Sequence, residues 1–292
     1  MSWLVFAPVV ILTALSLALA WRPLPVHPAW SARILVISVV TTALAALSTA
    51  LFVAAVYLAR LLPVDSVLSS GRGRLLLDHG PMPTNVGLMA LFLLAVGLFG
   101  TIRVGVGWWR DMRAVRVDTP SIRGHETPIA VAVPGHRGGV LVSTGMMRIL
   151  SREQLQVVFR HEHAHLRHRH HVYAILGALS AAVFPPLNST QRSLRLALER
   201  WADEDAAAAT GDRELVAHTI ARVALAAPAP RSAWHLAFAQ SQVVHRVEAL
   251  LGDAPSGSRV AGPALVGGTG VASGGIASSC VQLHHLLGLL LI

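Results

Sequence analysis

The chain has 292 residues, of which 53% are hydrophobic and only 13% are charged. Soluble domains carry roughly 25% charged residues, so this composition indicates a membrane protein rather than a soluble one. All 24 basic residues are arginines scattered along the chain, and Cys280 is the single cysteine, so we expect no lysine chemistry, no nucleic-acid partner, no internal disulfide and no cysteine zinc cluster.

Three apolar runs come first and predict three transmembrane helices, at about residues 2–21, 34–59 and 85–105. Each run approaches or exceeds the roughly 20 residues that a helix needs to cross a bilayer. Tryptophans stand near the ends of these runs, where amphipathic rings favour the lipid headgroup level. The first run has a signal peptide as its alternative, and buried helices of a large soluble core are the alternative for all three. We interpret residues 1–116 as a membrane region.

Arginines indicate how this region is oriented. Positive charge collects on the cytoplasmic side of membrane proteins. Arginines without acidic partners lie between the first and second runs, and more follow the third run: Arg22, Arg33, Arg103, Arg110, Arg113, Arg116 and Arg123. Arg72 and Arg74, between the second and third runs, oppose this orientation. We expect a multi-pass protein of the cell membrane, with its N-terminus outside and the domain after the third run in the cytoplasm.

Residues 117–252 have the character of a water-facing domain. The β-branched runs at 129–133 and 140–143 flank a Pro-Gly-containing turn and predict an antiparallel hairpin. Ser151 and Gln154 form a capping-box pattern at the start of a helix. We expect this helix to run toward Leu179 and to end at the latest at the two prolines that follow.

Three further helices are predicted, at about 189–210, from Asp212 to about 227, and at 243–251. Gly211 closes the first, and Asp212 caps the second. Residues 253–292 are rich in glycine and alanine, and we interpret them as a fourth transmembrane helix, with an apolar tail as the alternative. The predicted fold is therefore mainly α, with a small antiparallel β element.

His161 and His165 carry the chemical signal, because with Glu162 they form the pattern His-Glu-x-x-His. On a helix, histidines four residues apart share one face and reach a single zinc ion. Glu162 then lies beside the metal as a general base. A catalytic zinc usually takes a third protein ligand, for which Glu199 is the candidate, and Asp203 on the same helical face is placed to hydrogen-bond a ligand histidine.

Further histidines crowd the same helix: His163, His168, His170 and His171. Together with Arg167 and Arg169 they suggest a basic, solvated continuation of the helix. A second metal site is the alternative interpretation.

These patterns together resemble the BlaR/MecR-type integral-membrane zinc metallopeptidases and, more distantly, the HtpX and CAAX-prenyl-protease group. The resemblance rests on Val133-Pro134-Gly135, on Val140 to Gly145, on Phe159 to Leu166, and on Glu199 to Asp203 with Ala206. It implies a zincin-like α+β domain that holds one zinc ion. His161, His165 and Glu199 would bind the metal, Glu162 would be the general base, and Asp203 would orient a ligand histidine.

The resemblance also implies a substrate strand and an oxyanion donor. The strand of Val140, Leu141, Val142 and Ser143 would pair with an extended substrate. The candidates for the oxyanion donor are His218, His235, His245 and Arg246. The β-lactam sensors of the family carry a penicillin-binding domain as well, which we expect to be absent from this lysine-free chain.

The predicted function is a zinc endopeptidase that cuts a protein or peptide substrate near the cytoplasmic membrane face. A transcriptional repressor and a damaged membrane protein both fit as substrates, and the residues indicate no oligomeric state. The alternatives are a non-catalytic zinc-binding membrane scaffold and a metal transporter. Arg160, Arg167 and Arg169 argue against a transporter, because a transport site lies among apolar residues at mid-span.

Overall fold

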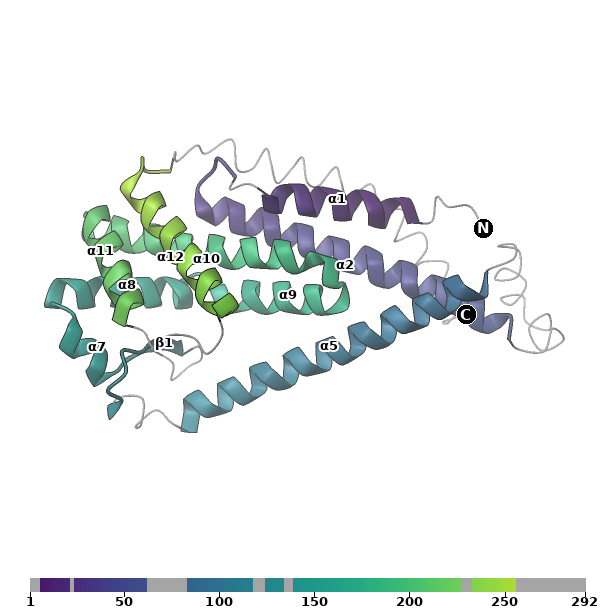
Figure 1. Cartoon of the computed structure of the whole chain (residues 1–292), viewed down its shortest axis with the longest axis horizontal. Coiled ribbons are helices and arrows are strands. Elements are labelled where there is room, and N and C mark those ends of the chain that lie inside the picture. The colour runs from purple at the N-terminus through teal and green to yellow at the C-terminus, as the bar shows by residue number, and fades with distance from the viewer. Residues whose placement is uncertain are drawn as a thin grey trace.

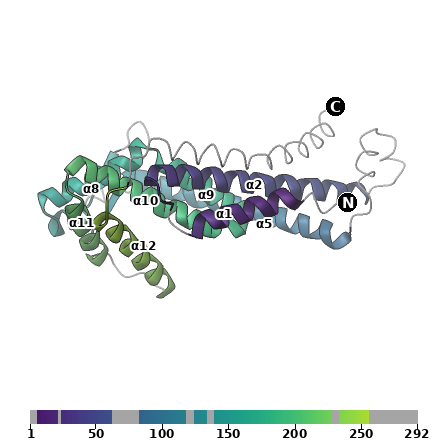
Figure 2. The ribbon, with the colours of Figure 1, turned by 90° about the horizontal axis from the view of Figure 1, so that it is seen from above.

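The computed structural model describes residues 6–21, 24–61, 83–117, 124–133, 139–226 and 233–255. The described part is elongated, with long helices side by side at one end and short helices with a hairpin at the other (Figures 1 and 2). It is mainly helical with a two-stranded antiparallel sheet, as predicted. The predicted fourth transmembrane helix lies almost wholly outside the described residues.

Two helices of the described part are long and apolar enough to cross a membrane. They are α2 (Pro28–Ala59) and, within α5 (Thr84–Val117), the stretch Thr84–Arg110. The helix α1 (Ala7–Trp21) is apolar but shorter. Helix α2 begins six residues before the predicted run because His27 caps it, its ring accepting a hydrogen bond from the Ala29 N–H, and because proline suits a first helical position. Arg33 therefore lies inside the helix.

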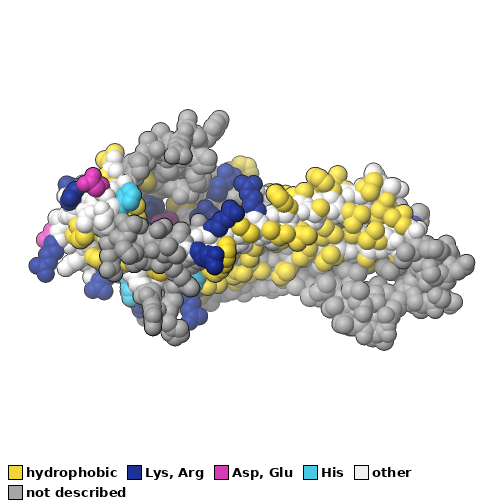
Figure 3. All heavy atoms as spheres, turned by 90° about the horizontal axis from the view of Figure 1, so that it is seen from below, with side chains coloured by type: hydrophobic (Ala, Val, Ile, Leu, Met, Phe, Trp, Pro, Cys, Tyr) yellow, Lys and Arg dark blue, Asp and Glu magenta, His cyan; other side chains and the backbone are white. Residues whose placement is uncertain are grey.

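An apolar surface runs along α5 on the face seen in Figure 3. Large exposed side chains of the helix include Leu88, Met89, Phe92, Leu98, Phe99 and Ile102. Arginine side chains gather where the apolar surface meets the end of the molecule that holds the short helices (Figure 3). Such a surface suits hydrocarbon better than water.

The predicted hairpin is confirmed as β1 (Ala130–Val133) and β2 (Gly139–Val142), with Ala130 opposite Val142. A short helix follows that the sequence analysis did not predict, α7 (Thr144–Ile149). Ser143 caps it by accepting a hydrogen bond from the Met146 N–H at 3.2 Å. The same hydroxyl donates to the Thr127 carbonyl, which ties the hairpin to the segment before it.

The capping box of Ser151 and Gln154 is confirmed at the start of α8 (Arg152–Arg167). The prediction of one helix through to about Leu179 was wrong, because the helix breaks after Arg167. Arg169 has φ 53° and ψ 43°, the left-handed conformation, and α9 (His170–Val183) starts in a new direction. The two prolines then begin a short 3-10 turn, η2 (Pro185–Leu187).

Helix α10 (Asn188–Thr210) ends as predicted at Gly211, whose φ is 74°. Asp212 accepts a hydrogen bond from the Leu215 N–H at 2.8 Å and thereby caps α11 (Arg213–Ala226). The last helix, α12 (Ala233–Leu251), begins ten residues earlier than predicted.

Helices α2 and α10 share one hydrophobic core. Ala29, Ala32, Leu35 and Val36 of α2 are buried against Leu194, Ala197, Leu198 and Trp201 of α10. This core contains residues from both sides of the predicted boundary near residue 116. The apolar helix α2 packs against α10, the helix that carries Glu199 and Asp203.

Candidate active site and its metal-binding residues

Two helices bring the predicted site residues together. His161 and His165 share one face of α8, and Glu199 and Asp203 share one face of α10, because residues four apart are neighbours on a helix. The two helices pack against each other, so the pairs meet. The Nε2 atoms of His161 and His165 are 3.2 Å apart, and they lie 3.5 and 3.7 Å from the Glu199 carboxylate oxygens.

These three side chains suit a zinc ion. Each offers one ligand atom, and the three atoms lie within 4.8 Å of one another. Tetrahedral zinc with bonds of about 2.0–2.1 Å requires ligand atoms roughly 3.3 Å apart, close to the distances between these side chains. Two imidazoles and a carboxylate are also the donor set of one type of catalytic zinc site.

Asp203 lies directly behind His161, with 2% of its side chain exposed, and its Oδ1 is 2.9 Å from His161 Nδ1. This contact holds the His161 proton on Nδ1 and leaves Nε2 free for a metal. Burial works against a charged ring, but hydrogen bonds to Asp203 and Glu199 raise the pKa of His161 to about 9. The negative charge that favours a proton on this ring also favours a cation beside it.

Arg246 of α12 completes the charge balance. Its Nε and Nη2 each donate to an Asp203 oxygen at 2.8 Å, and its Nη1 lies 3.2 Å from Glu199. Burial raises the pKa of the Asp203 carboxyl, but the hydrogen bonds and charge of Arg246 outweigh this and lower the pKa below its usual range. Burial likewise opposes ionisation of Glu199, yet the hydrogen bond with His161 and the charge of Arg246 lower its pKa. Both carboxylates are therefore ionised at neutral pH.

The Glu162 side chain lines the same cavities as His161 and Glu199. Burial raises its pKa, and a hydrogen bond from the Ala132 backbone acts in the opposite direction. A raised pKa is what a carboxyl group needs if it is to take up and release a proton near neutral pH. Burial also lowers the pKa of His165 to about 4, which keeps its ring neutral, as a metal ligand requires.

A cleft of about 690 Å³ is bordered by strand β1. Its lining includes the site residues His161, Glu162, His165, Glu199 and Arg246. Ala130, Val131 and Ala132 line the cleft beside Glu162, whereas Val140 of β2 lines a different cavity. The strand predicted to pair with substrate, Val140 to Ser143, is therefore the hairpin partner of the strand that lines the cleft.

A second cavity of about 430 Å³ adjoins the first, and it also contains His161, Glu162, Glu199 and Arg246. Its walls are mostly apolar and come from the segment before β1 and from helices α8 and α11: Ile129, Val157, Val158, Val216, Ile220 and Val223. The site is therefore polar at its centre and apolar on one flank.

The four oxyanion candidates lie in different places. Of the candidates whose side chains the structure describes, Arg246 lies at the site. His218 and His245 are 70% and 63% exposed and face Glu214 and Glu248 of their own helices. His235 belongs to α12, in the part whose side chains lie outside the description.

The sequence analysis missed the environment of two other histidines. His168 and His170 are not a solvated continuation of α8. His168 Nε2 lies 2.7 Å from an Asp205 oxygen, and His170 is only 2% exposed. Both environments follow from the break between α8 and α9. The sequence carries no signal for this break, because arginine does not favour the left-handed conformation that Arg169 adopts.

A His-Glu-x-x-His helix with a third acidic residue on a neighbouring helix defines a class of metallopeptidase site. Comparison with known families agrees: the family model of peptidase family M48 matches residues 122–195, about a quarter of the chain. The match covers the hairpin and α8 but stops before Glu199. It supports a metallopeptidase of family M48 without distinguishing a BlaR-like from an HtpX-like protein. No curated protein and no solved structure matches the chain.

Proposed function

We propose that this chain is an integral-membrane zinc endopeptidase that hydrolyses a peptide bond in a protein substrate near the cytoplasmic face. The convergence of His161, His165 and Glu199 beside Glu162, at the edge of a strand that borders a cleft, is the observation that supports it most. The match to peptidase family M48 supports the peptidase class independently of this geometry.

The proposed ligands of the zinc ion are His161, His165 and Glu199. Bound there, zinc would act as a Lewis acid toward the scissile carbonyl and would lower the pKa of a water molecule. Asp203 holds the ring of His161 in the metal-binding tautomer, and Arg246 fixes the position of both acidic side chains. The remaining N–H groups of Arg246 make it our candidate for the oxyanion donor.

Glu162 is the proposed general base. Its carboxylate accepts a proton from the attacking water and returns it to the leaving amine. Among the described residues β1 pairs with β2 on one side, and its other edge borders the cleft, where the Ala132 backbone donates to Glu162. We propose that an extended substrate backbone pairs along this edge. We therefore assign substrate pairing to β1 in place of β2.

The membrane location rests on the two long apolar helices and the apolar surface of α5. The distribution of arginines supports a cytoplasmic protease domain. Carbonate extraction of membranes tests the first statement, and reporter fusions after residues 61 and 117 test the second. Extraction into the soluble fraction would contradict an integral-membrane protein.

The decisive test compares wild type with Glu162→Gln and Glu199→Ala after purification in detergent. We expect about one zinc ion per chain in wild type and in Glu162→Gln, and loss of the zinc in Glu199→Ala. Cleavage of β-casein or of a quenched peptide library should fall by at least about 10²-fold in Glu162→Gln. Glu153→Gln, an exposed glutamate of the same helix, is the matched control.

Two outcomes would overturn the proposal. Undiminished cleavage by Glu162→Gln would exclude Glu162 as the general base. Zinc bound by a wild-type protein that cleaves no member of the library would instead favour the non-catalytic zinc scaffold.

A further inference from the structure

His170 is a buried histidine that touches the back of a proposed metal ligand. Its Nδ1 is 2.9 Å from the Nδ1 of His165, and the two rings meet edge to face with centroids 4.8 Å apart. The other nitrogen of His165, Nε2, faces His161 and Glu199. His170 thus stands behind His165 as Asp203 stands behind His161.

The break between α8 and α9 makes this contact possible. In a continuous helix, residues five apart would point about 140° away from each other, so His170 would face away from His165. The chain avoids this through the left-handed backbone of Arg169, with φ 53°. A non-glycine residue in that conformation is uncommon and costs roughly 1–2 kcal/mol. The structure thus places a strained residue one position before the histidine that contacts His165.

The hydrogen-bonding capacity of the two rings allows one arrangement. If His165 binds a metal through Nε2, its proton is on Nδ1. The Nδ1–H of His165 then donates to the Nδ1 of His170, which must be the unprotonated nitrogen of that ring. The proton of His170 is then on Nε2, an atom that is buried without a hydrogen-bond partner among the described residues.

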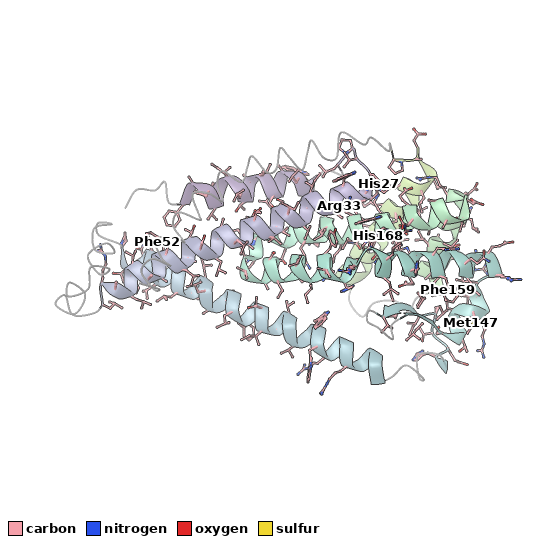
Figure 4. The ribbon with its side chains drawn as sticks, turned by 180° about the vertical axis from the view of Figure 1, so that it is seen from behind. His27, Arg33, Phe52, Met147, Phe159 and His168 are labelled. Carbon is pink, nitrogen blue, oxygen red and sulfur yellow. The ribbon has the colours of Figure 1, made fainter. Side chains whose placement is uncertain are left out.

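Aromatic contacts fix the ring of His170. The Trp201 ring lies 4.8 Å away, and the His168 ring stacks on His170 at 5.8 Å. Trp201 is itself 4% exposed and contacts the Arg33 guanidinium at 5.1 Å. Arg33 and His168, labelled in Figure 4, both contact the Trp201 ring. His168 and Trp201 therefore hold the ring of His170 in place, and Arg33 of α2 acts on it only through Trp201.

We propose that His170 is a positioning residue that accepts a hydrogen bond from His165 and thereby fixes the metal-binding tautomer and orientation of that ring. The inference rests on the proposed function, because it takes His165 as a metal ligand. A buried histidine placed only for packing would not need a ring nitrogen 2.9 Å from His165 Nδ1, and an apolar side chain would avoid a buried Nε2 that has no partner among the described residues. Loss of such a partner typically lowers metal affinity by about 10–100-fold.

The test compares His170→Leu with His170→Asn. Asparagine places its Oδ1 the same number of bonds from the backbone as the histidine Nδ1 and keeps an acceptor there, whereas leucine fills similar space without one. The zinc affinity of the full-length detergent-purified protein is measured by competition with a chelator. We expect an affinity about 10–100-fold lower in His170→Leu and within a few-fold of wild type in His170→Asn.

His163→Leu and His163→Asn are the matched controls, because His163 is an exposed histidine of α8. Equal losses in both His170 variants would show a merely structural role, and unchanged affinity in His170→Leu would exclude any role toward the metal. Should His170→Leu not fold, His170→Ala is titrated with imidazole, and failure of imidazole to restore zinc affinity would overturn the proposal. A wild-type protein without zinc affinity would instead refute the proposed function.

Discussion

Removal of the Asp203 carboxylate should be among the most damaging single changes at the site. The side chain is 2% exposed and has two hydrogen bonds of 2.8 Å from Arg246. It also lies 2.9 Å from His161 Nδ1. In Asp203→Ala the Arg246 side chain, 15% exposed, stays largely shielded from water, with Glu199 as its remaining acidic partner at 3.2 Å among the described residues.

The expected magnitude follows from these contacts. Removing one partner of a buried ion pair destabilises a protein by about 3–5 kcal/mol, because the other charge is left without compensation. Since Glu199 still faces Arg246, we expect the lower end of that range. The loss of the acceptor for His161 should in addition lower zinc affinity by about 10–100-fold.

Denaturant unfolding in detergent and chelator competition measure the two effects. Glu214→Ala is the control, because Glu214 and His218 form an exposed pair, 76% and 70% exposed, that should contribute about 0–1 kcal/mol. The double variant Asp203→Ala with Arg246→Ala should lose less free energy of unfolding than the sum of the losses in the two single variants. The expected coupling is about 0.5–3 kcal/mol. Additive losses, or a loss in Asp203→Ala no larger than in Glu214→Ala, would refute the reasoning.

Three further predictions concern the backbone and the apolar flank of the site. Arg169→Ile should lower the free energy of unfolding and weaken zinc binding, because a β-branched side chain is disfavoured more strongly than arginine in the left-handed conformation, whereas Arg169→Gly should be tolerated, because glycine adopts that conformation without strain; wild-type stability in the isoleucine variant would contradict this. Gly145→Ala should destabilise the protein and Gly139→Ala should not, since an added Cβ would lie 1.9 Å from the Glu126 carbonyl oxygen in the first and meets nothing within 4 Å in the second; equal melting temperatures would contradict the contact. Val223→Arg should place a charge at the half-buried wall of the apolar cavity of about 430 Å³ and select against apolar side chains next to the cut bond, as peptide-library cleavage would show, and an unchanged profile would exclude this cavity from substrate binding.

Local patterns could be predicted from the sequence because neighbouring residues determine them. The capping box at Ser151 and the glycine end of α10 depend on hydrogen bonds within one turn, and both are confirmed. The four-residue spacing of His161 with His165, and of Glu199 with Asp203, likewise requires only a helical period. The grouping of His161 with Glu199 joins two distant helices, and it was predicted from the need of a catalytic zinc for a third ligand.

The features that could not be predicted from the sequence depend on contacts between distant segments. The break at Arg169 follows from no local signal, since arginine does not favour a left-handed backbone, and the contacts of His170 with His165 and Trp201 accompany it. The sequence indicated a hairpin beside the motif but not which strand would border the cleft, because that depends on how the hairpin packs against α8. Arg246 was among four candidates, and only its contacts with Asp203 distinguish it from the exposed His218 and His245.

Helix α10 connects the membrane-type helices to the proposed metal site. One side of it is buried against α2 through residues such as Leu194 and Leu198, and another side presents Glu199 and Asp203 to α8. Trp201 lies in that core and also contacts the ring of His170. Since protein interiors are close-packed, a displacement of α2 against α10 cannot be absorbed without moving the rings behind His165. The packing of α2 against α10 therefore helps to determine the geometry of the proposed site.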